Sequence, residues 1–159
     1  MPRPWKPSVT VAAVVEREGR FLMVEEETPD GVRLNQPAGH LDPGETLAQA
    51  AGREAIEETA HPFRPTALLG VYVARSVPRD EPDGVTYVRF AFTGEVGPQD
   101  PERVLDDGIL RVLWLSVDEI RQRAAEHRSP LVMRCVDDYL AGRRFPLDFV
   151  YTHPSALAA

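Results

Sequence analysis

The stretch GHLDPGETLAQAAGREAIEE, which runs from Gly39 to Glu58, decides the fold of this chain. Its first residues carry the proline and glycines of a loop. Residues 46–59, in contrast, contain Gly52 as their one breaker and are rich in Ala, Glu and Gln, which favour helix. Pro62 and Pro65 stop this pattern. We therefore expect a loop that leads into a helix over 46–59.

One face of the expected helix changes from apolar to acidic along its length. At about 100° per residue, this face carries Leu47, Ala50, Ala51, Glu54, Glu57 and Glu58. Glu54 and Glu58 are one turn apart, and like charges about 5–6 Å apart repel by roughly 3 kcal/mol at an effective dielectric near 20. The negative end of the helix dipole disfavours carboxylates there as well.

Two interpretations of this acidic face remain open from the helix alone. The usual one is a solvated helix end, in which Arg53 offsets part of the repulsion with Glu57. A solvated cluster, however, should lie opposite the apolar residues rather than in line with them. The second interpretation is a site for a hard cation, because carboxylate oxygens suit Mg²⁺, for which Mn²⁺ can substitute. Bound ions would also allow an acidic protein to hold phosphate.

Composition excludes several classes of protein. The chain has 159 residues, with 18 basic and 25 acidic side chains and a net charge of −7, so binding of nucleic acid through an overall positive field is not expected. One cysteine, Cys135, excludes an internal disulfide framework, and we expect it to be a buried, inert thiol. No apolar run is long enough to cross a bilayer. We read the apolar stretch 9–15 as a strand rather than a secretory signal, and expect a cytoplasmic protein without a membrane partner.

The remaining elements are expected to alternate between strands and helices. The strand predictions are 9–15 and 20–26, joined as a hairpin, then 32–37, 66–77, 85–95 and 109–115. Two further helices are expected over 116–126 and 129–140; Ser116 and Glu119 form a capping-box pattern, Ser129-Pro130 starts the last helix, and Gly142 stops it. The class is α/β (or α+β) with a mixed sheet. We expect one domain over 1–159, with its core at about 7–147 and a short C-terminal tail, as a monomer or homodimer.

The stretch from Gly39 to His61 resembles the signature of the Nudix hydrolases. That signature is a Gly, five residues, a Glu, seven residues, Arg-Glu, two residues, Glu-Glu, one residue, then Gly and an aliphatic. The positions that match its spacing are Gly39, Glu45, Arg53, Glu54, Glu57 and Glu58. Ala60 and His61 depart from the final Gly and aliphatic, and an alanine in the left-handed turn costs about 1 kcal/mol or shifts the turn.

Three further stretches are similar to the NudJ phosphatase branch of that superfamily: residues 8–12, 35–41 and 128–132. The resemblance implies an α/β/α sandwich around a mixed sheet. It also implies hydrolysis of phosphoanhydride bonds in nucleoside tri- and diphosphates and in a thiamine-precursor pyrimidine diphosphate. A small phosphorylated substrate is therefore expected, with ADP-ribose or another nucleoside diphosphate joined to a second group as the alternative. A non-catalytic nucleotide-binding module is a more remote reading, because it would be expected to lack Glu57 or Glu58.

The resemblance also implies the metal ligands. By position they are Glu54, Glu57 and Glu58, with the carbonyl of Ala38 as a further one. The implied reaction is attack of water on a phosphorus, in which metal ions lower the pKa of the water and neutralise the phosphates. Glu54 is our first choice for the base, and an acid of the following loop, Asp106 or Asp107, is the second.

The remaining motif residues support this site. Arg53 would orient the acidic side chains, Glu45 would sit near the favourable start of the helix, and Gly39 would let the loop pass close to it. Substrate contacts are expected from Asn35, Gln36 and His40, although loop polar residues also occur without a ligand.

Outside the motif, a few residues have two readings each. Trp5 and Tyr87 either stack on a base or fill the core. Arg89 either holds phosphate or pairs with acids, and His61 is expected at the surface or in a helix cap.

Overall fold

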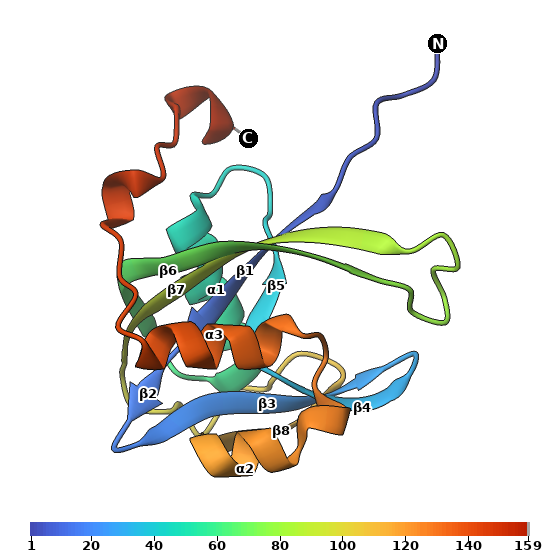
Figure 1. Cartoon of the computed structure of the whole chain (residues 1–159). Helices are drawn as coiled ribbons and strands as arrows, with labels where there is room; N and C mark the ends of the chain where they lie inside the picture. Colours follow the sequence, from blue (N-terminus) through green and yellow to red (C-terminus); the bar gives the residue numbers. More distant parts are fainter. Residues whose placement is uncertain (159) are drawn as a thin grey trace.

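Hydrogen bonding divides the strands into two sheets (Figure 1). The computed structural model describes residues 1–158. The first sheet has the order β5-β1-β7-β6 and is mixed, because β1 runs parallel to β7 while the other neighbours are antiparallel. Its strands are β1 (Ser8–Val14), β5 (Ala38–His40), β6 (Phe63–Ser76) and β7 (Val85–Val96). The long β6–β7 hairpin projects from the body of the molecule.

The second sheet is antiparallel and is built around β3, which pairs with β2, β4 and β8. Its strands are β2 (Glu16–Arg17), β3 (Arg20–Thr28), β4 (Gly31–Asn35) and β8 (Ile109–Ser116). The predicted mixed sheet is therefore confirmed, and this second sheet stands beside it.

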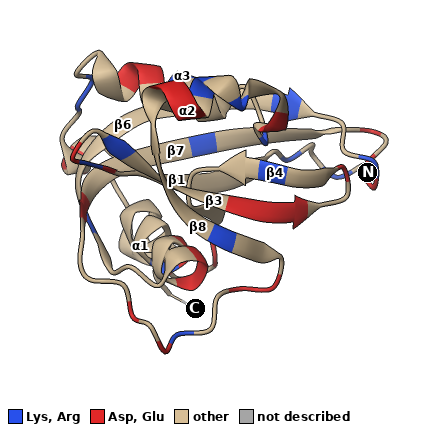
Figure 2. Ribbon diagram, turned by 90° about the horizontal axis from the view of Figure 1, so that it is seen from below, with Lys and Arg blue, Asp and Glu red and all other residues tan. Residues whose placement is uncertain are grey.

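Helices lie on both sides of the strands (Figure 2). They are α1 (Leu47–Thr59), α2 (Val117–Gln122) and α3 (Leu131–Leu140), with short 3-10 turns at Ala124–Glu126, Leu147–Phe149 and Pro154–Ala156. One apolar core joins α1 to β1, β6 and β7, and another joins α3 to the opposite faces of the strands. This arrangement is the expected α/β/α sandwich.

The expected hairpin between 9–15 and 20–26 is wrong in its pairing. Only the pair β2–β3 forms that hairpin, and β1 crosses to the other sheet, where Ser8–Val14 runs beside Tyr87–Thr93 of β7. The apolar residues of β1 are buried on both faces, as parallel strands require. This burial favours the pairing of β1 with β7, which is far away in the sequence, over a pairing with the neighbouring β3.

Local signals fix both ends of α1. Thr46 is the N-cap, and its hydroxyl accepts from the backbone N–H of Gln49, whose side chain binds the Thr46 N–H in return. At the other end Ala60 has φ 60° and ψ 17°, and its N–H donates to Ile56 O at 3.0 Å. The left-handed turn of the motif is thus kept with alanine in place of glycine.

The later helices follow their predicted caps. Ser116 and Glu119 form a capping box at the start of α2, which ends at Gln122 rather than continuing as regular helix to 126. The Ser129 hydroxyl accepts from Leu131 N–H at 3.1 Å at the start of α3, and Gly142 adopts φ 80° after its end. Within residues 1–158, none of the helices is both long and apolar enough to span a bilayer.

The cap of α1 gives a stability test. Thr46→Ala removes the acceptor for the Gln49 N–H and should lower the free energy of unfolding by about 1 kcal/mol. Thr46→Ser keeps a hydroxyl and should stay within roughly 0.5 kcal/mol of the parent. Urea denaturation compares the midpoints, and equal midpoints for all three proteins would contradict the capping role.

Candidate active site

The acidic face of α1 is turned toward the protein rather than the solvent. Glu54 and Glu58 are only 8% and 7% exposed, and Glu57 is partly buried. Ala50 and Ala51 on the same face belong to the apolar core. The helix therefore aims its carboxylates inward, which excludes the reading as a solvated helix end.

Three carboxylates meet at this end of the helix. Oxygen atoms of Glu54, Glu57 and Asp106 all lie within 4.8 Å of one another. Asp106 is brought there by its own backbone, since its N–H donates to Glu57 O at 3.0 Å. Asp107, one residue further along, is exposed and is outside this cluster. The structure thus places Asp106, rather than Asp107, beside the glutamates.

Glu58 binds the first residue of β5, the strand that precedes α1. Its Oε1 accepts from Ala38 N–H at 3.0 Å, so the Ala38 peptide adjoins the acidic site. Burial, with a smaller contribution from the nearby carboxylates of Glu26 and Glu54, raises the pKa of Glu58 to about 9. Without a cation, this side chain therefore carries a proton at neutral pH.

Arg53 holds the acidic side chains in place. Its guanidinium binds Glu45 through two bonds, Nε to Oε2 at 3.0 Å and Nη2 to Oε1 at 2.8 Å. Nη1 reaches Glu54 at 2.9 Å and Glu57 at 3.2 Å, while Nη2 also donates to His40 O at 2.8 Å. The pairing with Arg53 lowers the pKa of Glu45, whereas desolvation raises the pKa of Glu54 despite the same arginine.

Gly39 allows the loop to approach Glu54 closely. A Cβ atom at this position would lie 2.2 Å from the Glu54 carboxyl carbon and Oε1. Any side chain at residue 39 must therefore displace that carboxylate. The neighbouring His40 is exposed, and its ring centroid is 6.4 Å from that of Tyr87.

His61 is not at the surface, and that prediction is wrong. The residue is 4% exposed, its Nδ1 hydrogen-bonds with Gly97 O at 2.8 Å, and its ring packs edge-on against Trp114 at 5.8 Å. The left-handed turn at Ala60 directs the chain inward, so the histidine fills a core position with its polar nitrogen satisfied. This explains how it replaces the aliphatic of the motif.

A pocket of about 460 Å³ opens beside the acidic cluster. Its lining includes four carboxylates, Glu26, Asp42, Glu54 and Glu58, together with hydroxyl and guanidinium groups from Thr10, Arg75, Ser76, Tyr87, Arg89, Arg128 and Ser129. Such a volume suits a small organic ligand. Acidic and basic groups around one cavity are suited to a phosphorylated ligand that arrives with cations.

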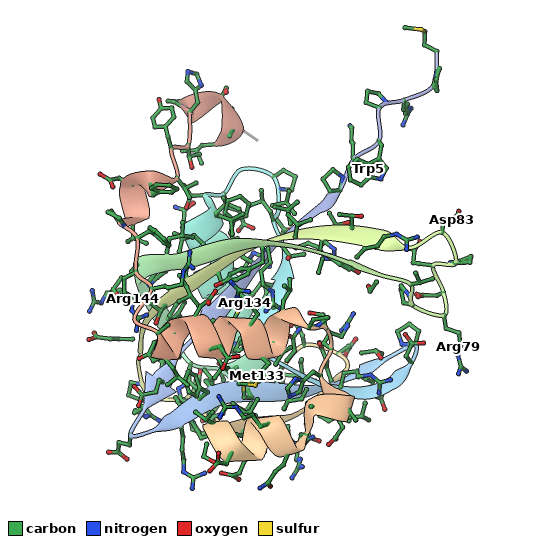
Figure 3. All side chains as sticks on the ribbon, viewed as in Figure 1. Trp5, Arg79, Asp83, Met133, Arg134 and Arg144 are labelled. Carbon is green, nitrogen blue, oxygen red and sulfur yellow. The ribbon has the colours of Figure 1, made fainter. Side chains whose placement is uncertain are left out.

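The predicted substrate contacts fall in different places. His40 and Asn35 line the pocket, whereas Gln36 is 1% exposed and lies behind its wall. Trp5 is 74% exposed on the N-terminal segment, away from the body of the protein (Figure 3). Tyr87 is therefore the aromatic residue of that pair that reaches the pocket.

Sequence reasoning missed the part that Glu26 plays in the pocket. Arg128 Nη1 and Asn35 Nδ2 donate to Glu26 Oε1 at 2.8 Å and 3.3 Å. The Glu26 carboxylate is also close enough to Glu58 to raise the pKa of Glu58. The only signal in the sequence was a run of three acids at the end of a strand. Such a run does not tell which member points inward.

The NUDIX domain family model matches residues 4–135. The chain belongs to the Nudix hydrolase family. Phosphatase NudJ of Escherichia coli K12 is 40% identical over 146 residues, which is 92% of each protein. A Nudix hydrolase structure from Nitrosomonas europaea has a TM-score of 0.87 and 50% identity, and covers 93% of this chain and 98% of that one.

A more distant Nudix neighbour is a bifunctional NMN adenylyltransferase/ADP ribose pyrophosphatase from Francisella tularensis, whose structure contains AMP and a Mn ion. It is 26% identical, with a TM-score of 0.59, and covers 88% of this chain and 43% of that one. The family and its NudJ relatives make this protein a hydrolase that acts on phosphoanhydride bonds. Enzymes of this kind generally use divalent metals, and this protein has a group of three carboxylates, Glu54, Glu57 and Asp106, whose spacing is compatible with such an ion.

The close approach at Gly39 gives a test of the site. Gly39→Ala should weaken Mn²⁺ binding roughly tenfold or more, because the new methyl group displaces the Glu54 carboxylate. Gly97→Ala is the matched control, since a Cβ there meets its nearest neighbour at 3.6 Å. Electron paramagnetic resonance of free Mn²⁺ gives both affinities. Equal affinities would show that Glu54 is not held at the ion.

The raised pKa of Glu58 gives a pH test on the metal-free enzyme. The folded state keeps a proton on this carboxyl between its ordinary value of 4.5 and about 9, whereas the unfolded state loses it. The folded state thus binds more protons, so stability falls as pH rises through that window. The melting temperature in EDTA should decrease across it, and the decrease should be smaller in Glu58→Gln, which cannot ionise. Parallel curves for the two proteins would contradict the assignment.

Proposed function

We propose that this Nudix enzyme is a divalent-metal-dependent hydrolase of small diphosphates. Nucleoside tri- and diphosphates are the first substrates to test, and a thiamine-precursor pyrimidine diphosphate is the next. The observation that carries the proposal is the cluster of Glu54, Glu57 and Asp106, whose buried member Glu54 also lines a pocket of about 460 Å³. The NudJ relatives, named as phosphatases, favour this substrate class.

The donor set suits a magnesium or manganese ion. Glu54, Glu57 and Asp106 offer only carboxylate oxygens, which hard divalent cations prefer. When bound, such an ion neutralises phosphate charge and makes water a better nucleophile at neutral pH. We assign the holding role to these three residues together with Glu58, and the Ala38 carbonyl as a further ligand.

The chain's own residues then divide the remaining work. Arg53 orients the Glu54 carboxylate through its bond to Oε1, and this carboxylate, beside the ion, is the first candidate for the base that takes a proton from the attacking water. Asp106 is the alternative base, because it lies in the same cluster and is exposed.

Cleavage of ADP-ribose, or of another nucleoside diphosphate joined to a second group, is the alternative activity. The Francisella neighbour, whose name includes ADP ribose pyrophosphatase, supports it. The 40% identity to NudJ phosphatases over nearly the whole chain favours the first reading. A binding module without catalysis is disfavoured, because every acidic residue of the motif is present.

A panel of diphosphates with Mg²⁺ or Mn²⁺ separates these readings. Release of orthophosphate from nucleoside tri- and diphosphates supports the proposal. Release of a nucleoside monophosphate from ADP-ribose at a higher kcat/KM supports the alternative. A flat progress curve with every compound and both metals would support the non-catalytic reading.

Glu58→Gln should reduce kcat by roughly 100-fold or more while the fold is retained. The amide mimics the protonated carboxyl that the metal-free protein already carries, and so leaves the contact with Ala38 sterically unchanged. Arg121→Gln, which removes a surface charge paired with Asp137, is the control and should keep parental activity. Turnover and circular dichroism measured together check the prediction, and near-normal turnover in Glu58→Gln with Mg²⁺ would overturn the site assignment.

A further inference from the structure

A buried arginine faces the pocket without a counter-charge. Arg89 is 5% exposed and lines the cavity. Throughout residues 1–158, no carboxylate oxygen lies within 4.0 Å of its guanidinium nitrogens. Its partners are Gln36 Oε1 at 2.9 Å, Asn35 Oδ1 at 2.9 Å and Cys135 Sγ at 3.7 Å. The amide oxygens are neutral, and burial raises the pKa of the thiol, which keeps it neutral too.

The other pocket arginines are in different electrostatic situations. Arg128 forms an ion pair with Glu26 at 2.8 Å, and Arg75 is exposed to water. A buried ion without its counter-ion costs several kcal/mol, which is why buried charges in proteins are normally paired. Within residues 1–158 Arg89 makes no direct ion pair, and an anion bound in the pocket would supply one.

The two amides that hold Arg89 are themselves held. The side-chain nitrogen of Gln36 donates to Val132 O at 2.8 Å, and that of Asn35 donates to Glu26 Oε1 at 3.3 Å. Each amide group is thus turned so that its oxygen faces the guanidinium. This accounts for the Asn35-Gln36 pair, and it makes these residues supports of the arginine.

Part of the guanidinium remains open to the cavity. Nη1 and Nη2 donate to the amides and the thiol, whereas Nε donates no hydrogen bond within residues 1–158. Within the described residues, every fully buried side-chain nitrogen has a hydrogen-bond partner. Because the Nε of Arg89 has no such partner, it is not fully buried. The planar fork of an arginine suits the oxygens of a phosphoryl group.

The sheet places Arg89 across the pocket floor from the acidic site. His40 of β5, Thr10 of β1 and Arg89 of β7 are aligned in register, so their side chains share one face. Ala38, whose N–H binds Glu58, lies two residues from His40 on that same face. Two strand spacings give roughly 10 Å between the Cα atoms of His40 and Arg89. Glu54, Glu58, Thr10 and Arg89 line the same pocket, so a substrate held at the carboxylates would extend toward Arg89.

We propose that Arg89 is an anion-binding residue that takes a phosphoryl oxygen of the substrate, with Asn35 and Gln36 as its positioning residues. The need for an anion follows from the uncompensated charge. The choice of phosphate as that anion rests on the proposed function. In this arrangement the phosphate chain is held from two sides, by cations at α1 and by Arg89 on β7.

The test uses methylenediphosphonate, a diphosphate analogue that cannot be hydrolysed, in EDTA so that no cation assists binding. Isothermal titration calorimetry should show that Arg89→Gln weakens binding roughly 10- to 100-fold. Arg121→Gln removes an exposed arginine far from the pocket and should bind as the parent does. Arg89→Lys keeps the charge but loses the fork, so it should fall between the two, and it serves as the test if Arg89→Gln does not fold. No binding by the parent, or equal affinity in the parent and the folded Arg89 variant, would overturn the proposal.

The positioning role has its own readout. Gln36→Met removes the acceptor without adding charge, and should weaken analogue binding in the parent but have no further effect in Arg89→Gln. An equal loss in both backgrounds would mean that Gln36 acts independently of Arg89, which overturns that part of the proposal.

Hydrolysis assays keep this inference separate from the proposed function. Analogue binding that depends on Arg89, in a protein that hydrolyses no diphosphate with Mg²⁺, supports the anion site and rejects the proposed reaction. Hydrolysis with an unchanged KM in Arg89→Gln supports the reaction and rejects the anion site.

Discussion

The site depends on the two-pronged pairing of Arg53 with Glu45. This pairing fixes a guanidinium at the start of the acidic region, where it also binds Glu54 and Glu57 and the carbonyl of His40. Without it, the carboxylates on one helix face would repel each other and turn toward water. Arg53 supplies enough positive charge to keep the group assembled but too little to neutralise it. The deficit is what makes the helix end attractive to divalent cations.

The fold supports this constraint through local and distant contacts. The capping box at Thr46 fixes where α1 starts, and the alanines of α1 pack on the mixed sheet. These two contacts together determine the rotation of the helix about its axis. Gly39 then lets β5 pass against the carboxylate of Glu54. The pocket is lined by strands of both sheets together with α1 and the start of α3.

Much of this could be predicted from sequence because the signals are local. The helix, the alignment of its acidic residues with its apolar face and the two later helix starts follow from periodicity and capping residues within a few positions. The pairing of β1 could not be predicted, since its partner β7 lies far along the chain and is chosen by burial on both faces. Asp106 could not be distinguished from Asp107, because a single backbone bond to Glu57 decides which one lies beside the glutamates. His61 was misplaced because the turn before it redirects the chain into the core.

The mixed sheet has a consequence for how this enzyme can diversify. The acidic residues of the cavity include Glu54 and Glu58 of α1 and Asp42 of the loop before it, while β7 and the start of α3 contribute Tyr87, Arg89 and Leu131. Substitutions on the second set alter which molecules are accepted without disturbing the reactive carboxylates. Selection can therefore change the substrate repertoire of such a scaffold while its hydrolytic machinery stays intact.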